Sequence, residues 1–226
     1  MFKQFVQKRL EKYVQEYFKA HPEVKLVAVA GSVGKTSTKT AIATVLSRQL
    51  RVRMDSSNHN THMSAPLGML GIDYPESVHN IVAWLAVFSA ARKRIKEAAD
   101  VDVVVQELGT DHPGEIAHFG TYLKPDIGIV TAITPEHMEF FKTLDAVAEE
   151  EMTLANMSKL AIINRDDIDS KYAQDLTNAN ILTYGSTSAA EYHIEIDDFE
   201  LAHGFAGKLI EQKQKAPLSA NVRVLG

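Results

Sequence analysis

The stretch Ala30-Gly31-Ser32-Val33-Gly34-Lys35-Thr36-Ser37-Thr38 decides the fold of this chain. The residues just before it, 25–29, are mostly apolar and β-branched at alternate positions, which predicts a buried strand. Residues 40–46, just after it, carry apolar side chains at helical spacing. A strand, a glycine loop, a lysine followed by a hydroxyl residue, and a helix together predict a binding site for phosphate groups.

The glycine loop supplies the groups that phosphate binding needs. Its glycines let backbone N–H groups turn toward an anion, and the following helix adds positive potential at its N-terminus. Lys35 would reach the outer phosphates, and the Thr36 hydroxyl would bind a magnesium ion. The loop is shorter than the common G-x-x-x-x-G-K-[ST] pattern, because Val29 stands where its first glycine would fall. The predicted phosphate contacts are Gly31, Ser32, Val33, Gly34, Lys35, Thr36 and Ser37.

Composition and charge exclude several classes of function. The chain has 226 residues, no cysteine and a net charge of −5. It therefore has no disulfide or thiolate metal site, and its overall charge gives no attraction to nucleic acid or to anionic membranes. Its longest apolar run, residues 81–91 apart from Ser89, is about half of what crossing a bilayer requires. These features fit a cytoplasmic protein without a membrane span.

Residues 1–21 form a predicted amphipathic helix. Aromatic and aliphatic side chains recur there at three- and four-residue steps, with lysines and an arginine between them. Such a helix can lie on a membrane or on a partner, including a second copy of the chain. We expect it to pack on the protein's own core, and self-association that depends on Phe5 and Leu10 is the alternative.

Strands alternate with helices from residue 22 to residue 188. Strands are expected at 25–29, 51–54, 101–106, 126–133, 159–163 and 180–184, and long helices at 75–99 and 143–158. This alternation predicts an α/β fold of the P-loop type, with a mainly parallel sheet in a three-layer arrangement between helices. Residues 189–226 change to short alternating segments, at 192–196 and 222–225, which predict a small antiparallel β appendage.

Polar residues gather where the expected strands end. Glu107 and His137 each follow a strand, as the glycine loop does. Ligands of parallel sheets bind outside the carboxyl ends of the strands, so these groups are expected to share one site. The polar loop 55–62 suits contact with a ligand, although turns favour the same residue types. Its candidate ligand-binding residues are Asn58, Asn60, Thr61 and His62.

One carboxylate stands out on the helix predicted at 143–158. Helical spacing places Glu151 in line with the apolar stripe, whereas Glu149 and Glu150 are expected to face water. An unpaired carboxylate that faces a core is costly. Glu151 is therefore expected to meet a cation or a metal ion, or to lie at a solvent-accessible rim.

These motifs together resemble the ATP-dependent Mur ligases, which build the peptide of bacterial cell-wall (peptidoglycan) precursors. The short G-S-x-G-K-T-S loop, the segments 106–109 and 112–116, and the motifs Thr134-Pro135-Glu136-His137 and Ile163-Asn164-Arg165-Asp166-Asp167 carry the resemblance. The likeness covers roughly residues 24–226 and favours the branch that adds D-alanyl-D-alanine to UDP-N-acetylmuramoyl-tripeptide. Cyanophycin and folylpolyglutamate synthetases share much of the family core and are ranked lower.

The resemblance implies a role for each matching residue. Lys35 and the loop amides would hold the ATP phosphates, and Asn164 would contact the nucleotide. Thr36 and Glu107 would bind one Mg²⁺, and His137 a second. The family's carbamylated lysine is matched by Glu151, fourteen residues after His137, whose carboxylate would take its place.

The resemblance also implies a reaction. A substrate carboxylate attacks the γ-phosphate of ATP, and an amine then displaces phosphate from the acyl phosphate. UDP-MurNAc-peptide and D-Ala-D-Ala would be the partners. The family's sugar-binding and C-terminal domains have no counterpart in the 226 residues. We therefore expect the central ATPase domain of a longer protein, with weak ATP binding and little ligase turnover on its own.

Two other functions fit parts of the sequence. A GTPase would use Asp111-His112-Pro113-Gly114 as its D-x-x-G motif and Asn164-Arg165-Asp166-Asp167 to read guanine, but both matches are short. A nucleotide-gated partner module without catalysis would keep the phosphate site and dock through the first helix.

Overall fold

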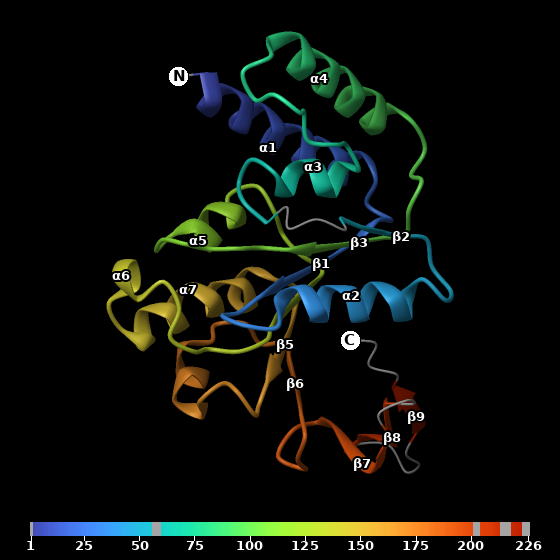
Figure 1. Cartoon of the computed structure of the whole chain (residues 1–226), viewed down its shortest axis with the longest axis vertical. Coiled ribbons are helices and arrows are strands. Elements are labelled where there is room, and N and C mark those ends of the chain that lie inside the picture. The colour runs from blue at the N-terminus through green and yellow to red at the C-terminus, as the bar shows by residue number, and fades with distance from the viewer. Residues whose placement is uncertain (1, 56–59, 201–203, 213–217, 223–226) are drawn as a thin grey trace.

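The computed structural model describes residues 2–55, 60–200, 204–212 and 218–222 (Figure 1). Its helices are α1 (Phe2–Ala20), α2 (Lys35–Leu46), α3 (Ala65–Leu70), α4 (Ile81–Lys96), α5 (Glu115–Gly120), α6 (Met138–Phe141), α7 (Leu144–Met157) and the 3₁₀ helix η1 (Ser170–Asp175). Its strands are β1 (Lys25–Ala30), β2 (Val52–Met54), β3 (Val103–Glu107), β4 (Ile127–Val130), β5 (Leu160–Asn164), β6 (Ile181–Gly185), β7 (Tyr192–Glu200), β8 (Gly204–Glu211) and β9 (Leu218–Val222).

The described strands form one sheet in the order β2-β3-β1-β4-β5-β6-β7-β8-β9. Neighbours from β2 to β7 pair in parallel, and β7-β8-β9 pair antiparallel. The predicted α/β fold with a mainly parallel sheet is thus confirmed. Because β1 lies between β3 and β4, Val29 pairs with Glu107 and Ala30 with Val130. The ends of three strands meet there, just before the glycine loop.

Both faces of the central strands are buried, which explains their nearly continuous apolar sequence. Leu26, Ala28 and Ala30 belong to a core that also includes side chains of α1, α3, α4 and α5. Val27 and Val29 face the opposite side and pack near Ala43 of α2. Figure 1 shows α3 over one face of the sheet, α1 and α4 outside α3, and α2 on the other face.

Helix α1 packs on the protein's own core, as expected. Its buried side chains come from one stripe, and it contacts α3 and α4. Leu10 is fully buried inside the protomer, so it is not available for self-association, whereas Phe5 is 59% exposed. Among the described helices, none is both long and apolar enough to cross a membrane.

Helix α4 is shorter than the sequence pattern indicates. We expected residues 75–99, but α4 begins at Ile81 and ends at Lys96. The Asn80 side chain accepts hydrogen bonds from the backbone N–H groups of Val82 and Ala83, at 3.0 and 3.2 Å. This capping stops the helix from extending backwards.

The C-terminal segment continues the main sheet. β7 pairs in parallel with β6 through Tyr184↔Tyr192 and Gly185↔His193, and an antiparallel ladder follows. β8 was not predicted, because the glycines in Gly-Phe-Ala-Gly weaken the strand pattern. The strand expected at 222–225 lies instead at Leu218–Val222, and residues 223–226 lie outside the described part.

Candidate functional site

The glycine loop is locked to the segment that follows β4. Gly31 has a φ of 124°, and a Cβ there would lie 2.2 Å from the Thr131 hydroxyl oxygen, so only glycine fits. The Ser32 N–H donates to the Ala132 carbonyl at 2.9 Å, and the Thr131 hydroxyl donates to the Val33 carbonyl at 2.6 Å. The loop therefore has a fixed shape before any phosphate contact is made.

Lys35 lies in the first turn of α2, over the glycine loop. Its ammonium donates to the carbonyls of Gly31 and Ser32 at 2.5 and 3.3 Å. Its Nζ also lies 3.7 Å from Oε2 of Glu136. The lysine is thus positioned by the loop itself and by one carboxylate.

Glu107, at the end of β3, joins the loop to the neighbouring strand. Its Oε2 accepts a hydrogen bond from the Thr36 hydroxyl at 2.8 Å and lies 3.5 Å from Nζ of Lys39. Asn60 donates to the other carboxylate oxygen at 3.3 Å. A buried carboxylate beside a hydroxyl offers the oxygen ligands that Mg²⁺ prefers, so Thr36 and Glu107 fit the predicted metal role.

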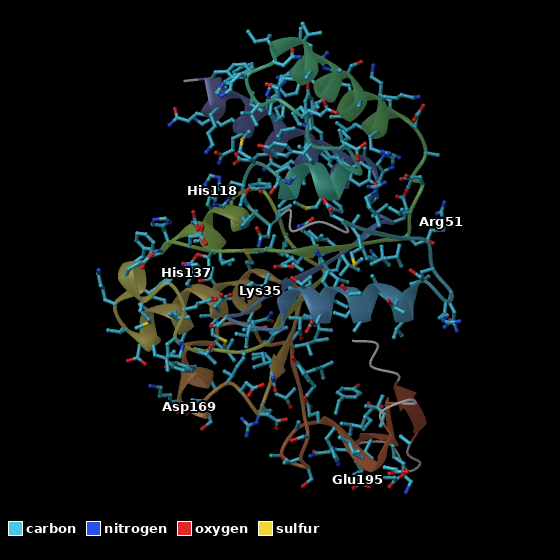
Figure 2. All side chains as sticks on the ribbon, viewed as in Figure 1. Lys35, Arg51, His118, His137, Asp169 and Glu195 are labelled. Carbon is cyan, nitrogen blue, oxygen red and sulfur yellow. The ribbon has the colours of Figure 1, made fainter. Side chains whose placement is uncertain are left out.

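A cavity of about 110 Å³ brings the separated motifs together. Figure 2 shows Lys35 and His137 on the same side of the sheet. Nε2 of His137 lies 3.4 Å from Oδ1 of Asp111. The lining residues come from α2, the polar loop, the loop after β3, the first residue of α5 and the residue just before α6: Lys35, Asn60, Thr61, His62, Gly109, Thr110, Asp111, Glu115 and His137.

The polar loop reaches this cavity with three of its four candidate residues. The Thr61 hydroxyl lies 2.9 Å from that of Ser64 at the start of α3. The His62 ring packs on Phe119 and His118, at centroid distances of 4.4 and 4.6 Å. Burial, and then the nearby His118, lower the pKa of His62, which favours the neutral form of its ring. Asn58 lies outside the described residues.

Glu151 points inward from α7 and contacts the glycine loop. Its side chain is fully buried, and its Oε2 accepts a hydrogen bond from the Gly31 N–H at 2.6 Å. Burial raises the pKa of Glu151 to about 8, with Lys35 opposing the shift and the adjacent Glu136 carboxyl adding to it. At neutral pH the protonated carboxyl is therefore the main form.

The second metal site stays a prediction. Within the described ranges, no cluster of three or more His, Asp or Glu side chains is placed to hold a metal ion. His137 lines the cavity, whereas Glu151 lies against the Gly31 N–H.

The expectation that Glu150 faces water is wrong. Glu150 is 5% exposed, and its carboxylate accepts from the N–H groups of Gly114 and Ile116, both at 2.6 Å. It thereby satisfies two backbone donors at the start of α5, which a carboxylate does well because the helix end is electropositive. Only Glu149 of the two neighbours is exposed.

The sequence patterns did not single out two residues of the site. Glu136 belongs to the Thr-Pro-Glu-His motif and contacts Lys35, but only its neighbour His137 was singled out. Lys39 is buried beside Glu107, one helical turn after Lys35, so the i,i+4 spacing could have indicated it.

Among the predicted nucleotide contacts, Lys35 lines the cavity, whereas the following do not: Gly31, Ser32, Val33, Gly34, Thr36, Ser37 and Asn164. The Asn164 amide donates to the Thr131 carbonyl and to Asp167, both at 2.8 Å, and shapes the loop after β5. Ser37 is exposed in the first turn of α2. Their contacts with nucleotide stay predictions.

Two curated relatives that match most of this chain are named as ligases. The UDP-N-acetylmuramoyl-tripeptide–D-alanyl-D-alanine ligase of Rickettsia prowazekii is 29% identical over 181 residues, which cover 77% of this chain and 35% of that protein. The enzyme of the same name from Bacillus subtilis is 25% identical over 202 residues, which cover 89% of this chain and 39% of that protein. The chain thus spans well under half the length of these relatives.

Solved structures share the fold. MurF from Acinetobacter baumannii aligns with a TM-score of 0.71 at 17% identity, over 95% of this chain and 42% of that one. MurF from Thermotoga maritima, in complex with ADP, aligns with a TM-score of 0.65 at 21% identity, over 90% of this chain and 42% of that one. E. coli FolC in complex with ADP aligns with a TM-score of 0.57 at 17% identity, over 91% of this chain and 51% of that one.

The family match agrees with the geometry of the loop and of the strand ends around it. Residues 29–226 match the family described as Mur ligase middle domain, which is most of the chain. The matched region includes the glycine loop, Glu107 and His137. This chain therefore belongs to the Mur ligase family and contains its middle domain.

Proposed function

We propose that this chain binds ATP with Mg²⁺ at the glycine loop and serves an ADP-forming ligation of a carboxylate to an amine. The observation that supports this most directly is the meeting of Lys35, Thr36 and Glu107 at the ends of β1 and β3. A phosphate-binding loop, a lysine and an oxygen pair suited to Mg²⁺ are the parts that phosphoryl transfer requires. Lys35 also lines the cavity, where the group that receives the phosphoryl would bind.

The reaction we propose proceeds through an acyl phosphate. An oxygen of the substrate carboxylate attacks the γ-phosphorus in line, and ADP leaves. The amine nitrogen then attacks the acyl carbon, phosphate leaves, and the amine loses a proton as the amide forms. Lys35 and the loop amides would stabilise the charge on the transferring phosphoryl group. Thr36 and Glu107 would hold Mg²⁺, which supplies further charge neutralisation when bound.

The substrates we propose are UDP-MurNAc-tripeptide and D-Ala-D-Ala, which would place the protein in peptidoglycan synthesis. The names of the relatives from R. prowazekii and B. subtilis support this choice. The fold likeness to FolC leaves other carboxylate substrates as the competing possibility.

Calorimetric titration with ATP in the presence and absence of Mg²⁺ tests the nucleotide site. We expect Lys35→Ala to weaken MgATP binding at least about tenfold, because a phosphate loses its cationic partner. Lys19→Ala, an exposed lysine at the end of α1, is the matched control and leaves binding unchanged. Equal affinity of Lys35→Ala and wild type would refute the site, and GTP displacing ATP would favour the GTPase alternative.

The substrate assignment needs a separate test. We would titrate UDP-MurNAc-tripeptide into the protein saturated with a non-hydrolysable MgATP analogue, and compare it with folate. Preference for the UDP-sugar peptide supports the peptidoglycan role. Binding of folate alone would contradict that role while leaving the ATP site intact.

A further inference from the structure

The outer faces of α1 and α4 expose large apolar side chains next to one another. On α4 and just before it, Val82 is 73% exposed, Ile81 61%, Leu85 60% and Val78 41%. At the start of α1, Phe5 is 59% and Phe2 41% exposed. We call these six side chains the α1–α4 patch.

The patch is held by a packed interior. Phe5 contacts Phe88 with ring centroids 6.4 Å apart, and Phe88 in turn contacts Tyr13 at 5.9 Å. Trp84 and Phe88 are almost completely buried on the inner side of α4. The exposed side chains therefore stand on two helices fixed to each other, on the outermost layer of the molecule (Figure 1).

Basic residues are frequent on the two helices that carry the patch, although the protein as a whole is negative. Lys3 and Lys8 are exposed close to Phe5 in α1, whereas the basic residues of α4 lie at its C-terminal end, after the patch. Helix α1 contains five basic and two acidic residues, and α4 contains four basic residues and no acidic one. The whole chain has a net charge of −5. Three of these basic residues are paired with acids: Lys12 with Glu16 at 3.7 Å, Lys93 with Glu97 at 3.6 Å, and Arg94 with Asp100 at 2.5 Å. The basic residues are thus concentrated on the layer that carries the exposed apolar side chains.

We propose that the outer face of α1 and α4 docks on the surface of an anionic lipid bilayer. The apolar side chains would enter the boundary between headgroups and acyl chains, and the lysines and arginines would contact the lipid phosphates. An apolar stripe flanked by basic residues is the pattern that interfacial helices use. A second copy fits less well, because two-fold pairing of this face would place the same basic helices against each other.

Co-sedimentation with vesicles tests this directly on the full chain. We expect binding to vesicles that contain phosphatidylglycerol, little binding to phosphatidylcholine alone, and weakening as salt rises from about 0.1 to 0.5 M. The double variant Val82→Ser/Leu85→Ser and the double variant Lys8→Glu/Lys96→Glu are each expected to lower binding at least about tenfold.

Matched controls lie on the other side of the sheet. Val45 of α2 is 70% exposed, and Arg48 follows that helix, so Val45→Ser and Arg48→Glu change the same chemistry elsewhere. Both controls should bind vesicles as wild type does, and circular dichroism melting checks that every variant is folded. Equal loss in controls and patch variants, or no binding to anionic vesicles, would overturn the proposal. So would light scattering showing a dimer that Val82→Ser/Leu85→Ser disrupts while vesicles bind nothing.

Discussion

Glu151 shows how burial sets the state of a single residue. Its carboxyl has a folded-state pKa of about 8, against 4.5 for the exposed group, chiefly because it is buried. Between these values the folded protein holds a proton that the unfolded chain has lost, so stability falls as pH rises. We predict that metal-free protein loses stability from pH 5 to pH 8, by at most about 1.4 kcal/mol per pH unit.

Urea unfolding at several pH values measures this slope. Glu151→Gln should flatten it, because the amide carries no titrating proton and its oxygen can still accept from the Gly31 N–H. Glu149→Gln, on the exposed neighbour, should leave the slope unchanged. If Glu151→Gln keeps the wild-type slope, another group is responsible.

Glu136 acts on the same lysine from the other side. Its carboxylate lies 3.7 Å from the Lys35 ammonium and would repel a triphosphate that the lysine is to bind. We predict that Glu136→Gln tightens ATP binding about fivefold, which corresponds to roughly 1 kcal/mol. Calorimetric titration measures the change, with Glu139→Gln on the exposed start of α6 as control. Weaker binding by Glu136→Gln would mean that the carboxylate positions Lys35 productively.

At the scale of an element, the glycine loop depends on two distinct constraints. Gly31 combines a φ of 124° with a Cβ position only 2.2 Å from the Thr131 hydroxyl oxygen. Gly114 has a φ of 91° but open space around its Cβ position. We predict that Gly31→Ala lowers the free energy of unfolding by roughly 3 kcal/mol or more, and Gly114→Ala by about 1–2 kcal/mol. If urea denaturation gives the same loss of unfolding free energy for both variants, the positive φ alone, and not the contact with the Thr131 hydroxyl, determines the loss.

Sequence patterns identify elements better than they identify partners. The alternating apolar residues of β1 and the glycine loop were predictable, because local spacing determines them. Glu150 was not, because its burial depends on α5, more than thirty residues away, bringing the N–H groups of Gly114 and Ile116 to it. Likewise, the Asn80 side chain caps α4 and fixes its first residue, and the apolar spacing of the sequence did not indicate this cap. The spacing of residue types along the sequence does not predict contacts between segments that lie far apart in the chain.

Over the whole molecule, the centre of the sheet is paired more extensively than its C-terminal end. The central pair β1–β3 shares five register pairs, whereas β7 joins β6 through only two. Among the described residues, the three apolar cores contain no side chain beyond Tyr184. The antiparallel strands β7 and β8 are therefore held mainly by their pairing with each other and by the short pairing of β7 with β6.

We predict that β7 and β8 open without unfolding of the parallel sheet. Local opening has a lower free energy where few buried apolar contacts must be broken, so amides in residues 192–200 and 204–211 should exchange faster than those of β1, β3 and β4. Hydrogen exchange followed by mass spectrometry, repeated at low urea, measures both sets. Exchange of β7 and β8 should change little with urea, since local opening exposes little new surface, whereas β1 should follow global unfolding. Equal protection and an equal urea slope in both sets would instead show that the sheet unfolds as one cooperative unit.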